Sequence, residues 1–276
     1  MILTLYVDGL LLLVANKLLL NKFKKQLMVR FEMADMGALS RVLGTNVALD
    51  REKGTVNIHQ RGYSEDVIKR FCMKDCNSTY TPGVDLELPL NQSKAKLLDK
   101  ENKKHYQAIT GAVMCLGRVS RYDILFAVNQ LARAMSNPSK AQMVAAKHLL
   151  RYLAASVNFS ISYMQGGFKL AVYSDAYWGN NPDNGKSMYL YIIMLANGPI
   201  SFKVGFQSQT THSTMEAELM VAVLTVKGAM FCSNMMVDLA FEKRFSSVPL
   251  YLDNASTLHV AGNRTYSPRA KHLAPS

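Results

Sequence analysis

The sequence predicts a protein of mixed α+β or α/β class, with strands near both ends and helices between them. Paired apolar runs separated by turn residues mark strands near the N-terminus and again after residue 158. Apolar residues at helical spacing mark helices from Lys17 and through residues 105–157. The 276 residues, 49% of them apolar and 19% charged, suffice for one large domain or two of ordinary size.

The first residues predict a hairpin followed by a helix. Apolar runs at Ile2–Val7 and Leu10–Val14 flank Asp8-Gly9, a dipeptide that is a strong hairpin signal. From Lys17 the spacing becomes helical, and the apolar face is expected to hold Leu18, Leu19, Phe23, Leu27 and Phe31. Because Asp8 and Gly9 interrupt the apolar run, we expect neither a secretion signal nor a membrane span there.

The middle of the chain predicts one more hairpin and then helices. The hairpin is expected at Val42–Leu49 and Thr55–Gln60, and Tyr63–Phe71 has the spacing of a short amphipathic helix. Residues 82–104 are polar and rich in lysine without a clear period, which indicates a linker. Helices with apolar stripes then fill residues 105–157, and Ser139 is placed to cap one of them.

Beyond residue 158 the pattern returns to strands. Phe159–Met164 and Lys169–Ser174 are expected to pair with each other. Tyr189–Ala196 and Pro199–Val204 should form a second pair around Asn197-Gly198, a type I′ turn signal. A helix and a last strand follow, and this strand should join the sheet in parallel because it returns after a helix.

Three acids stand at comparable places in this last part. Asp175 ends an apolar strand, Glu218 lies in the helix, and Asp253 ends the last strand, at spacings of 43 and 35 residues. An aspartate at a strand end is, taken alone, more often a turn residue than a ligand. Three carboxylates converging from strand, helix and strand would instead suit Mg²⁺ or Mn²⁺, the kind of metal that drives phosphodiester cleavage.

Two glutamates near the helix start must be told apart. Ser213 and Glu216 have the spacing of a capping box, which gives Glu216 a structural task. Glu218 lies roughly 200° further around the helix. Glu218 is therefore the better metal candidate.

The net charge of +12 predicts an anionic partner, with nucleic acid first, although a solvated basic surface remains the alternative. The basic residues expected to contact it lie on the polar faces of the first two helices: Lys22, Lys24, Lys25, Lys69 and Arg70. Four scattered cysteines indicate a reducing compartment and no zinc site. We expect an intracellular protein, cytoplasmic or nuclear, without a small-molecule cofactor or a membrane.

Several stretches resemble known families. The segments of the three acids, YSDAYWGN, MEAELMVA and LYLDNAS, resemble those that carry the catalytic acids of ribonuclease H. LYVDG resembles the palm hairpin of a reverse transcriptase, with Gly9 where that family has a second Asp after Asp8. FEMADMGALSRVLGTNV and YQAITGAVMCLGRVSRYDILFAVNQLARAMSNPS are similar to copia-type long-terminal-repeat retrotransposon polyproteins. The resemblance extends along nearly the whole chain.

The resemblance implies a domain order and an activity. The order is a palm-end and thumb remnant of reverse transcriptase at 1–81, a linker at 82–104, a helical connection at 105–157 and a ribonuclease H-like mixed-sheet domain at 158–276. The activity is metal-dependent hydrolysis of RNA in RNA–DNA hybrids. Asp175, Glu218 and Asp253 would be the catalytic and metal-holding residues, with Mg²⁺ (or Mn²⁺) as cofactor.

Departures from the family pattern lower the expected activity. We expect no DNA synthesis, because Gly9 replaces the second Asp and the acid of an earlier palm strand is not found before Met1. Near the other end, Lys271-His272 resembles the family's ending, but Ala274 stands where a fourth metal acid belongs, so cleavage should be weak or undetectable. Two alternatives stay open: a non-catalytic, basic nucleic-acid-binding remnant, and a domesticated or silent fragment with no activity.

Overall fold

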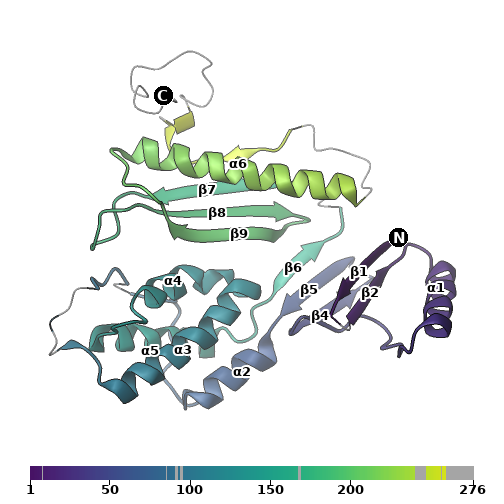
Figure 1. The fold of residues 1–276 in the computed structure, drawn as a ribbon, viewed down its shortest axis with the longest axis horizontal. Coiled ribbons are helices and arrows are strands. Elements are labelled where there is room, and N and C mark those ends of the chain that lie inside the picture. The colour runs from purple at the N-terminus through teal and green to yellow at the C-terminus, as the bar shows by residue number, and fades with distance from the viewer. Residues whose placement is uncertain are drawn as a thin grey trace.

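The fold is mixed α/β, as the sequence predicted. A computed structural model describes residues 1–7, 9–84, 86–90, 93, 96–166, 169–239, 247–255 and 257–258. These residues form two four-stranded sheets, a separate two-stranded hairpin and a group of helices (Figure 1). Asp8 and the ending around His272 and Ala274 lie outside the described residues.

The N-terminal hairpin and helix form where they were expected. Strands β1 (Ile2–Tyr6) and β2 (Gly9–Leu13) pair antiparallel. Helix α1 (Lys17–Arg30) begins at Asn16, whose side chain accepts a hydrogen bond from the Leu18 amide at 2.8 Å. The apolar side of α1 does not enter a core, since none of its residues is buried and Leu18 is 80% exposed.

The first four-stranded sheet has the order β3-β4-β5-β6. Its strands are β3 (Arg41–Val42), β4 (Thr45–Asp50), β5 (Thr55–His59) and β6 (Ile161–Met164). The predicted β4–β5 hairpin is confirmed. The single strand predicted at Val42–Leu49 is split, because Leu43 and Gly44 adopt positive φ in a tight turn.

Strand β6 corrects one predicted pairing. It pairs antiparallel with β5, with Ile58 opposite Ile161, and not with the strand that follows it in the chain. The expected hairpin of Phe159–Met164 with Lys169–Ser174 is therefore wrong. An alternating apolar run predicts that a strand forms, but it does not predict which strand pairs with it. Here β6 pairs with the edge of β5.

The helical part surrounds the largest group of buried side chains. Its elements are α2 (Arg61–Arg70), α3 (Lys100–Val119), the 3₁₀ turn η2 (Tyr122–Ile124), α4 (Leu125–Arg133) and α5 (Lys140–Ala155). Fully buried members of this core include Val67, Tyr106, Ile109, Leu116, Leu131, Leu149 and Leu150. The predicted Ser139 cap on α5 is confirmed as a complete capping box with Gln142. Helix α3 starts before Tyr106, because Asp99 caps it through the Asn102 amide.

Arg121 joins the ends of two of these helices. The residue is 2% exposed and forms an ion pair with Asp123 at 2.7 Å. Its guanidinium also donates to the Ser156 carbonyl at 3.0 Å and to the Ser156 hydroxyl at 2.6 Å. Because Ser156 follows α5 and Arg121 follows α3, this one side chain fixes both helix ends.

The second sheet has the order β10-β7-β8-β9. Its strands are β7 (Ala171–Tyr177), β8 (Met188–Leu195), β9 (Gly198–Phe206) and β10 (Leu250–Tyr251). The predicted antiparallel strands, helix and returning parallel strand are confirmed. The β8–β9 turn lies one residue earlier than predicted, since Ala196 and Asn197 carry the positive φ values, 52° and 63°.

Helix α6 (Thr214–Asp238) covers one face of the second sheet (Figure 1). Its Ala229, Cys232 and Met236 pack with Val172 and Ile193 of the sheet. Within the described ranges, α6 is the helix that by length and composition alone could cross a membrane, with a mean hydropathy of 1.5. The core helix of a soluble domain meets the same test, and α6 here packs on a sheet.

Among the described residues, the helical part covers the other face of this sheet over β9 and, through the contact of Gln130 with Met188, at the start of β8. Helix α4 and η2 lie there, with the Tyr122 ring against Phe202 and the Asn129 side chain bonded to the Val204 carbonyl. Arg133 of α4 donates to Asn181 at 2.8 Å and forms an ion pair with Asp183 in the β7–β8 loop. These contacts attach the helical part to the second sheet.

Candidate metal centre

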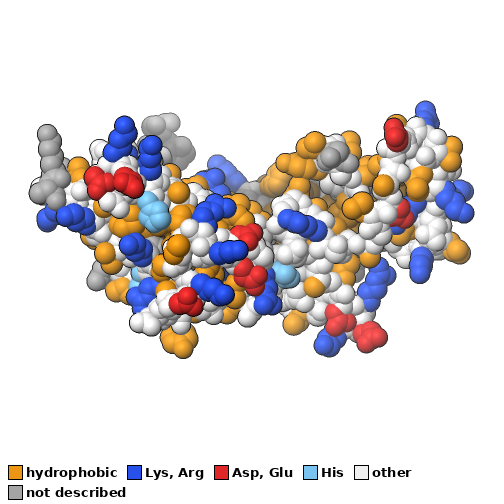
Figure 2. Space-filling view, turned by 90° about the horizontal axis from the view of Figure 1, so that it is seen from below, with side chains coloured by type: hydrophobic (Ala, Val, Ile, Leu, Met, Phe, Trp, Pro, Cys, Tyr) orange, Lys and Arg blue, Asp and Glu red, His pale blue; other side chains and the backbone are white. Residues whose placement is uncertain are grey.

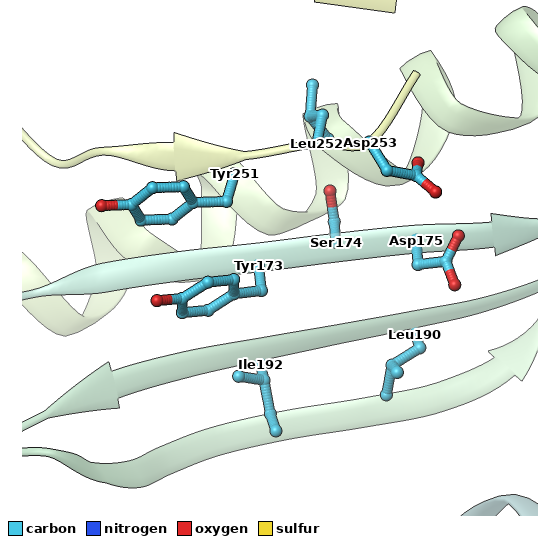
Figure 3. A pocket seen from close by; sticks show the side chains of 8 residues that line it. All are labelled: Tyr173, Ser174, Asp175, Leu190, Ile192, Tyr251, Leu252 and Asp253. Carbon is cyan, nitrogen blue, oxygen red and sulfur yellow. The ribbon is translucent and has the colours of Figure 1, made fainter.

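The fold brings the three predicted acids together. Asp175 lies near the end of β7, Glu218 in the second turn of α6, and Asp253 two residues after β10. One carboxylate oxygen from each lies within 4.8 Å of the others. The carboxylates of Asp175 and Asp253 are directed toward the same space in Figure 3. Three carboxylate oxygens this close together could hold a small hard cation.

The short length of β10 explains how Glu218 reaches this point. Among the described residues, strand β10 pairs with β7 only at Val172 and Tyr173, and no described strand covers the edge of β7 beyond them. The Ala176 amide lies on this free edge and donates to Oε1 of Glu218 at 3.1 Å. The Glu218 carboxylate thus accepts the backbone hydrogen bond that a neighbouring strand would otherwise accept. This bond holds the carboxylate beside Asp175.

Glu218 has one unsatisfied oxygen. The residue is 4% exposed, and its Oε2 is buried without a hydrogen-bond partner among the described residues. A buried carboxylate oxygen without a partner is costly, and a bound cation removes that cost. The pKa of Glu218 is raised to about 7, chiefly by burial, with the Ala176 amide lowering it and the neighbouring Asp175 and Asp253 contributing to the rise.

Glu216 has a different task, as expected. The Ser213 side chain caps α6 by accepting a hydrogen bond from the Glu216 amide at 3.2 Å. The Glu216 carboxylate accepts from the His212 amide at 2.7 Å, one residue before the position that a capping box predicts. Both contacts hold the start of the helix that carries Glu218.

Two loops at this end of the sheet are tied to each other, and sequence reasoning missed their contacts. The Trp178 indole N–H donates to the Thr211 carbonyl at 3.1 Å. Ser187 and Thr211 share a hydrogen bond at 3.0 Å between their hydroxyls, and Gln207 donates to the Ala217 carbonyl at 2.9 Å. The turn residues after Asp175 predicted a loop but not its partner. The bonds to Thr211 join the β7–β8 loop to the loop between β9 and α6, and the Gln207 bond joins that second loop to α6.

The predicted nucleic-acid contacts fall into two separate groups. Lys22 and Lys25 are exposed on α1, whereas Lys24 is engaged with Asp35 at 2.7 Å. Lys69 and Arg70 are exposed in the last turn of α2, which Figure 1 places well away from α1. Figure 2 shows Lys and Arg side chains spread over the face of the molecule with Asp and Glu between them. The five residues do not form one patch, and Asp8 lies outside the described residues.

Comparisons with known proteins identify the family. Residues 1–85 match the family described as reverse transcriptase (RNA-dependent DNA polymerase). The Retrovirus-related Pol polyprotein from transposon TNT 1-94 of Nicotiana tabacum is 30% identical over 275 residues, which are 99% of this chain and 21% of that relative. The chain belongs to the copia-type retrotransposon Pol polyproteins.

Two further relatives match most of the chain. The Pol polyprotein from transposon RE1 of Arabidopsis thaliana is 30% identical over 98% of the chain and 18% of the relative. An uncharacterized mitochondrial protein of Arabidopsis thaliana is 30% identical over 82% of the chain and 91% of its own length. This Pol region spans about a fifth of the length of the transposon polyproteins that it matches.

Proposed function

We propose that the second sheet and α6 form a ribonuclease H-like unit that hydrolyses RNA in RNA–DNA hybrids at Asp175, Glu218 and Asp253. Two observations on Glu218 carry the proposal: its Oε2 is buried without a hydrogen-bond partner among the described residues, and one of its carboxylate oxygens lies within 4.8 Å of an oxygen of each aspartate. Three acids that only repel one another would be a poor structural element, whereas a shared cation turns the repulsion into attraction. The antiparallel strands, helix and parallel strand agree with such a unit.

Asp175, Glu218 and Asp253 would hold Mg²⁺ or Mn²⁺ through their carboxylate oxygens. Bound there, the metal would activate a water molecule and stabilise the leaving oxygen of a phosphodiester. Glu218 is fixed by the Ala176 amide and Asp175 by its place in β7, so two of the three acids are held before substrate binds. Such preorganisation lowers the cost of forming the site.

We expect the activity to be weak. Ala274 occupies the place where the family resemblance implies a fourth acid, so the metal would be held by fewer protein oxygens. Mn²⁺ tolerates irregular coordination better than Mg²⁺, which demands near-ideal octahedral geometry. Cleavage should therefore be faster in Mn²⁺ than in Mg²⁺.

The test is cleavage of an end-labelled RNA–DNA hybrid by the purified full chain in Mg²⁺ and in Mn²⁺. Asp175→Asn should abolish cleavage, because it removes one ligand charge while leaving the side-chain shape nearly unchanged. Asp238→Asn, an equal change at the distant end of α6, serves as the matched control and should cleave as the native chain does. Cleavage by Asp175→Asn at the rate of the native chain would contradict the proposal, because it would not depend on the three acids.

For the reverse transcriptase part we propose that no DNA synthesis occurs. In the palm hairpin, the residue after Asp8 is Gly9, so the second acid of the family pattern is not there to hold a metal. Primer extension on an RNA template should stay at background, and Gly9→Asp alone should not restore it. Extension by the native chain would contradict this part of the proposal.

The second candidate function is nucleic-acid binding without catalysis, which the net charge of +12 favours. Binding of this kind depends on phosphate contacts, so its affinity falls steeply as salt rises. A hybrid that binds with such a salt dependence but is never cleaved in either metal would favour this candidate over the nuclease.

A further inference from the structure

Helix α6 is apolar on the side that faces away from the sheet as well as on the side that faces it. Ala229, Cys232 and Met236 lie on the sheet side and are buried. The outward side exposes Phe231 by 69% and Met230 by 60%, and its other exposed apolar residues include Val223, Leu224, Val226 and Met235. A helix that is apolar all round is typical of one that is buried on all sides. An exposed apolar surface of this kind indicates a contact site.

A line of polar residues divides this outward side. Lys227, Asn234 and Asp238 follow one another at spacings of seven and four residues, so they lie within about 40° of each other around the helix. All three are exposed, and apolar residues flank the line on both sides. Within the described ranges, neither Lys227 nor Asp238 forms an ion pair. Two opposite charges are therefore available at the two ends of the line.

The order of these charges makes the outward side complementary to a second copy of itself. Two α6 helices that pack antiparallel are related by a two-fold axis. If that axis passes between residues 232 and 233, Lys227 of each copy lies at the same level along the helix as Asp238 of the other. The two Asn234 side chains then meet near the axis, where each amide can donate to and accept from the other. All polar groups of the line thus obtain partners.

The apolar residues also fit this arrangement. A two-fold axis of this kind places each flank of the polar line against the same flank of the second copy. On one flank, Met230 would lie beside Val237 of the second copy, and on the other flank Phe231 would lie beside Met235. All four side chains are exposed in the single chain. Their removal from water would supply the driving force for association.

We propose that the chain forms a two-fold symmetric dimer through the outward side of α6, with the two helices antiparallel. A lipid bilayer is the other surface that an apolar helix face could contact. A bilayer would bury Lys227, Asn234 and Asp238 without partners, which is costly, whereas a second copy supplies a partner for each. The inference goes beyond the proposed function and uses none of the three acids, because Glu218 lies on the buried side of α6.

Sedimentation velocity of the purified full chain over a series of concentrations tests the dimer. The salt is held at about 0.15 M to screen the charge of +12. The native chain should be dimeric at high concentration and dissociate on dilution. Phe231→Glu should leave a monomer, because it places a charge in the apolar flank. Val144→Glu, at a position of α5 that is 68% exposed, is the matched control and should dimerise as the native chain does.

Exchanging the two charges tests the antiparallel arrangement. Lys227→Glu would place two carboxylates opposite each other at both ends of the interface, and Asp238→Lys would do the same with two ammonium groups. Each change should weaken the dimer by about 10- to 100-fold. The double variant with both changes restores opposite charges and should dimerise nearly as well as the native chain. Because all these positions are exposed, the variants should keep the native circular dichroism spectrum.

Several results would overturn the proposal. A native chain that stays monomeric at every concentration would do so, and so would a dimer that Phe231→Glu does not weaken. A double variant as weak as the single ones would exclude the antiparallel arrangement. A monomer that binds phosphatidylcholine vesicles, and loses that binding with Phe231→Glu, would assign the outward side to a membrane instead. Hybrid cleavage depends on acids on the other side of α6, so the nuclease and the dimer can fail separately.

Discussion

The N-terminal hairpin with α1 and the helical part from α3 to α5 differ most in what lies beneath their apolar side chains. Both have apolar residues at helical spacing, and both were predicted to be helical. In α1 no residue is buried, whereas α5 alone buries Leu149, Leu150 and Leu153 completely. Amphipathic spacing therefore predicts that a helix forms, but only a packed partner makes its apolar side chains stabilising.

The largest expected effect contrasts these two regions directly. Leu149→Ala should lower the free energy of unfolding by about 2–5 kcal/mol, because it leaves a cavity in a close-packed core. Leu18→Ala in α1, where the side chain is 80% exposed, should change it by less than about 0.5 kcal/mol. Urea denaturation followed by circular dichroism measures both. Comparable losses for the two variants would show that α1 packs against something in solution.

The next prediction concerns the free-energy cost of burying a charged carboxylate. The folded-state pKa of Glu218 is raised to about 7 from an ordinary 4.5, so the folded protein holds this proton more tightly than the unfolded chain. Its contribution to stability is complete below pH 4.5 and is lost as the pH rises through 7, by about 3 kcal/mol. Glu218→Gln should remove this loss. Denaturation midpoints at several pH values measure it, and identical pH profiles for both proteins would contradict it.

A smaller effect concerns the cation. At ten times its dissociation constant, Mg²⁺ should stabilise the native chain by about 1.4 kcal/mol, because it binds the folded state alone. The melting temperature should then rise by a few degrees, and Asp175→Asn should not respond. If neither Mg²⁺ nor Mn²⁺ raises the melting temperature, or if Asp175→Asn responds equally, the three acids do not form a metal site.

The smallest effect distinguishes the two basic groups. Replacing Lys22 and Lys25 of α1, or Lys69 and Arg70 of α2, by alanine should reduce the salt dependence of duplex binding by about one phosphate contact per residue that participates. Fluorescence anisotropy over a salt series measures the slope. A slope that neither pair changes would place the phosphate contacts elsewhere.

Local chemistry made much of this molecule predictable. Asp8-Gly9, Ser139 and Ser213 marked a turn and two caps, and the strand, helix and strand order carried Asp175, Glu218 and Asp253 to one place. What sequence reasoning missed depends on long-range contacts. The pairing of β6 with β5, the buried role of Arg121 and the bond from Ala176 to Glu218 each join residues whose proximity no local pattern encodes.

The pairing of β5 with β6 also constrains the order of folding. Ile58 and Ile161 are neighbours in one ladder, yet α3, α4 and α5 are synthesised between them. During synthesis, the edge of β5 that pairs with β6 therefore stays unpaired until those helices have emerged from the ribosome. Contacts so distant in sequence close slowly, whereas the helices assemble through nearer ones. We expect the helical part to fold first and to act as the template on which the first sheet closes.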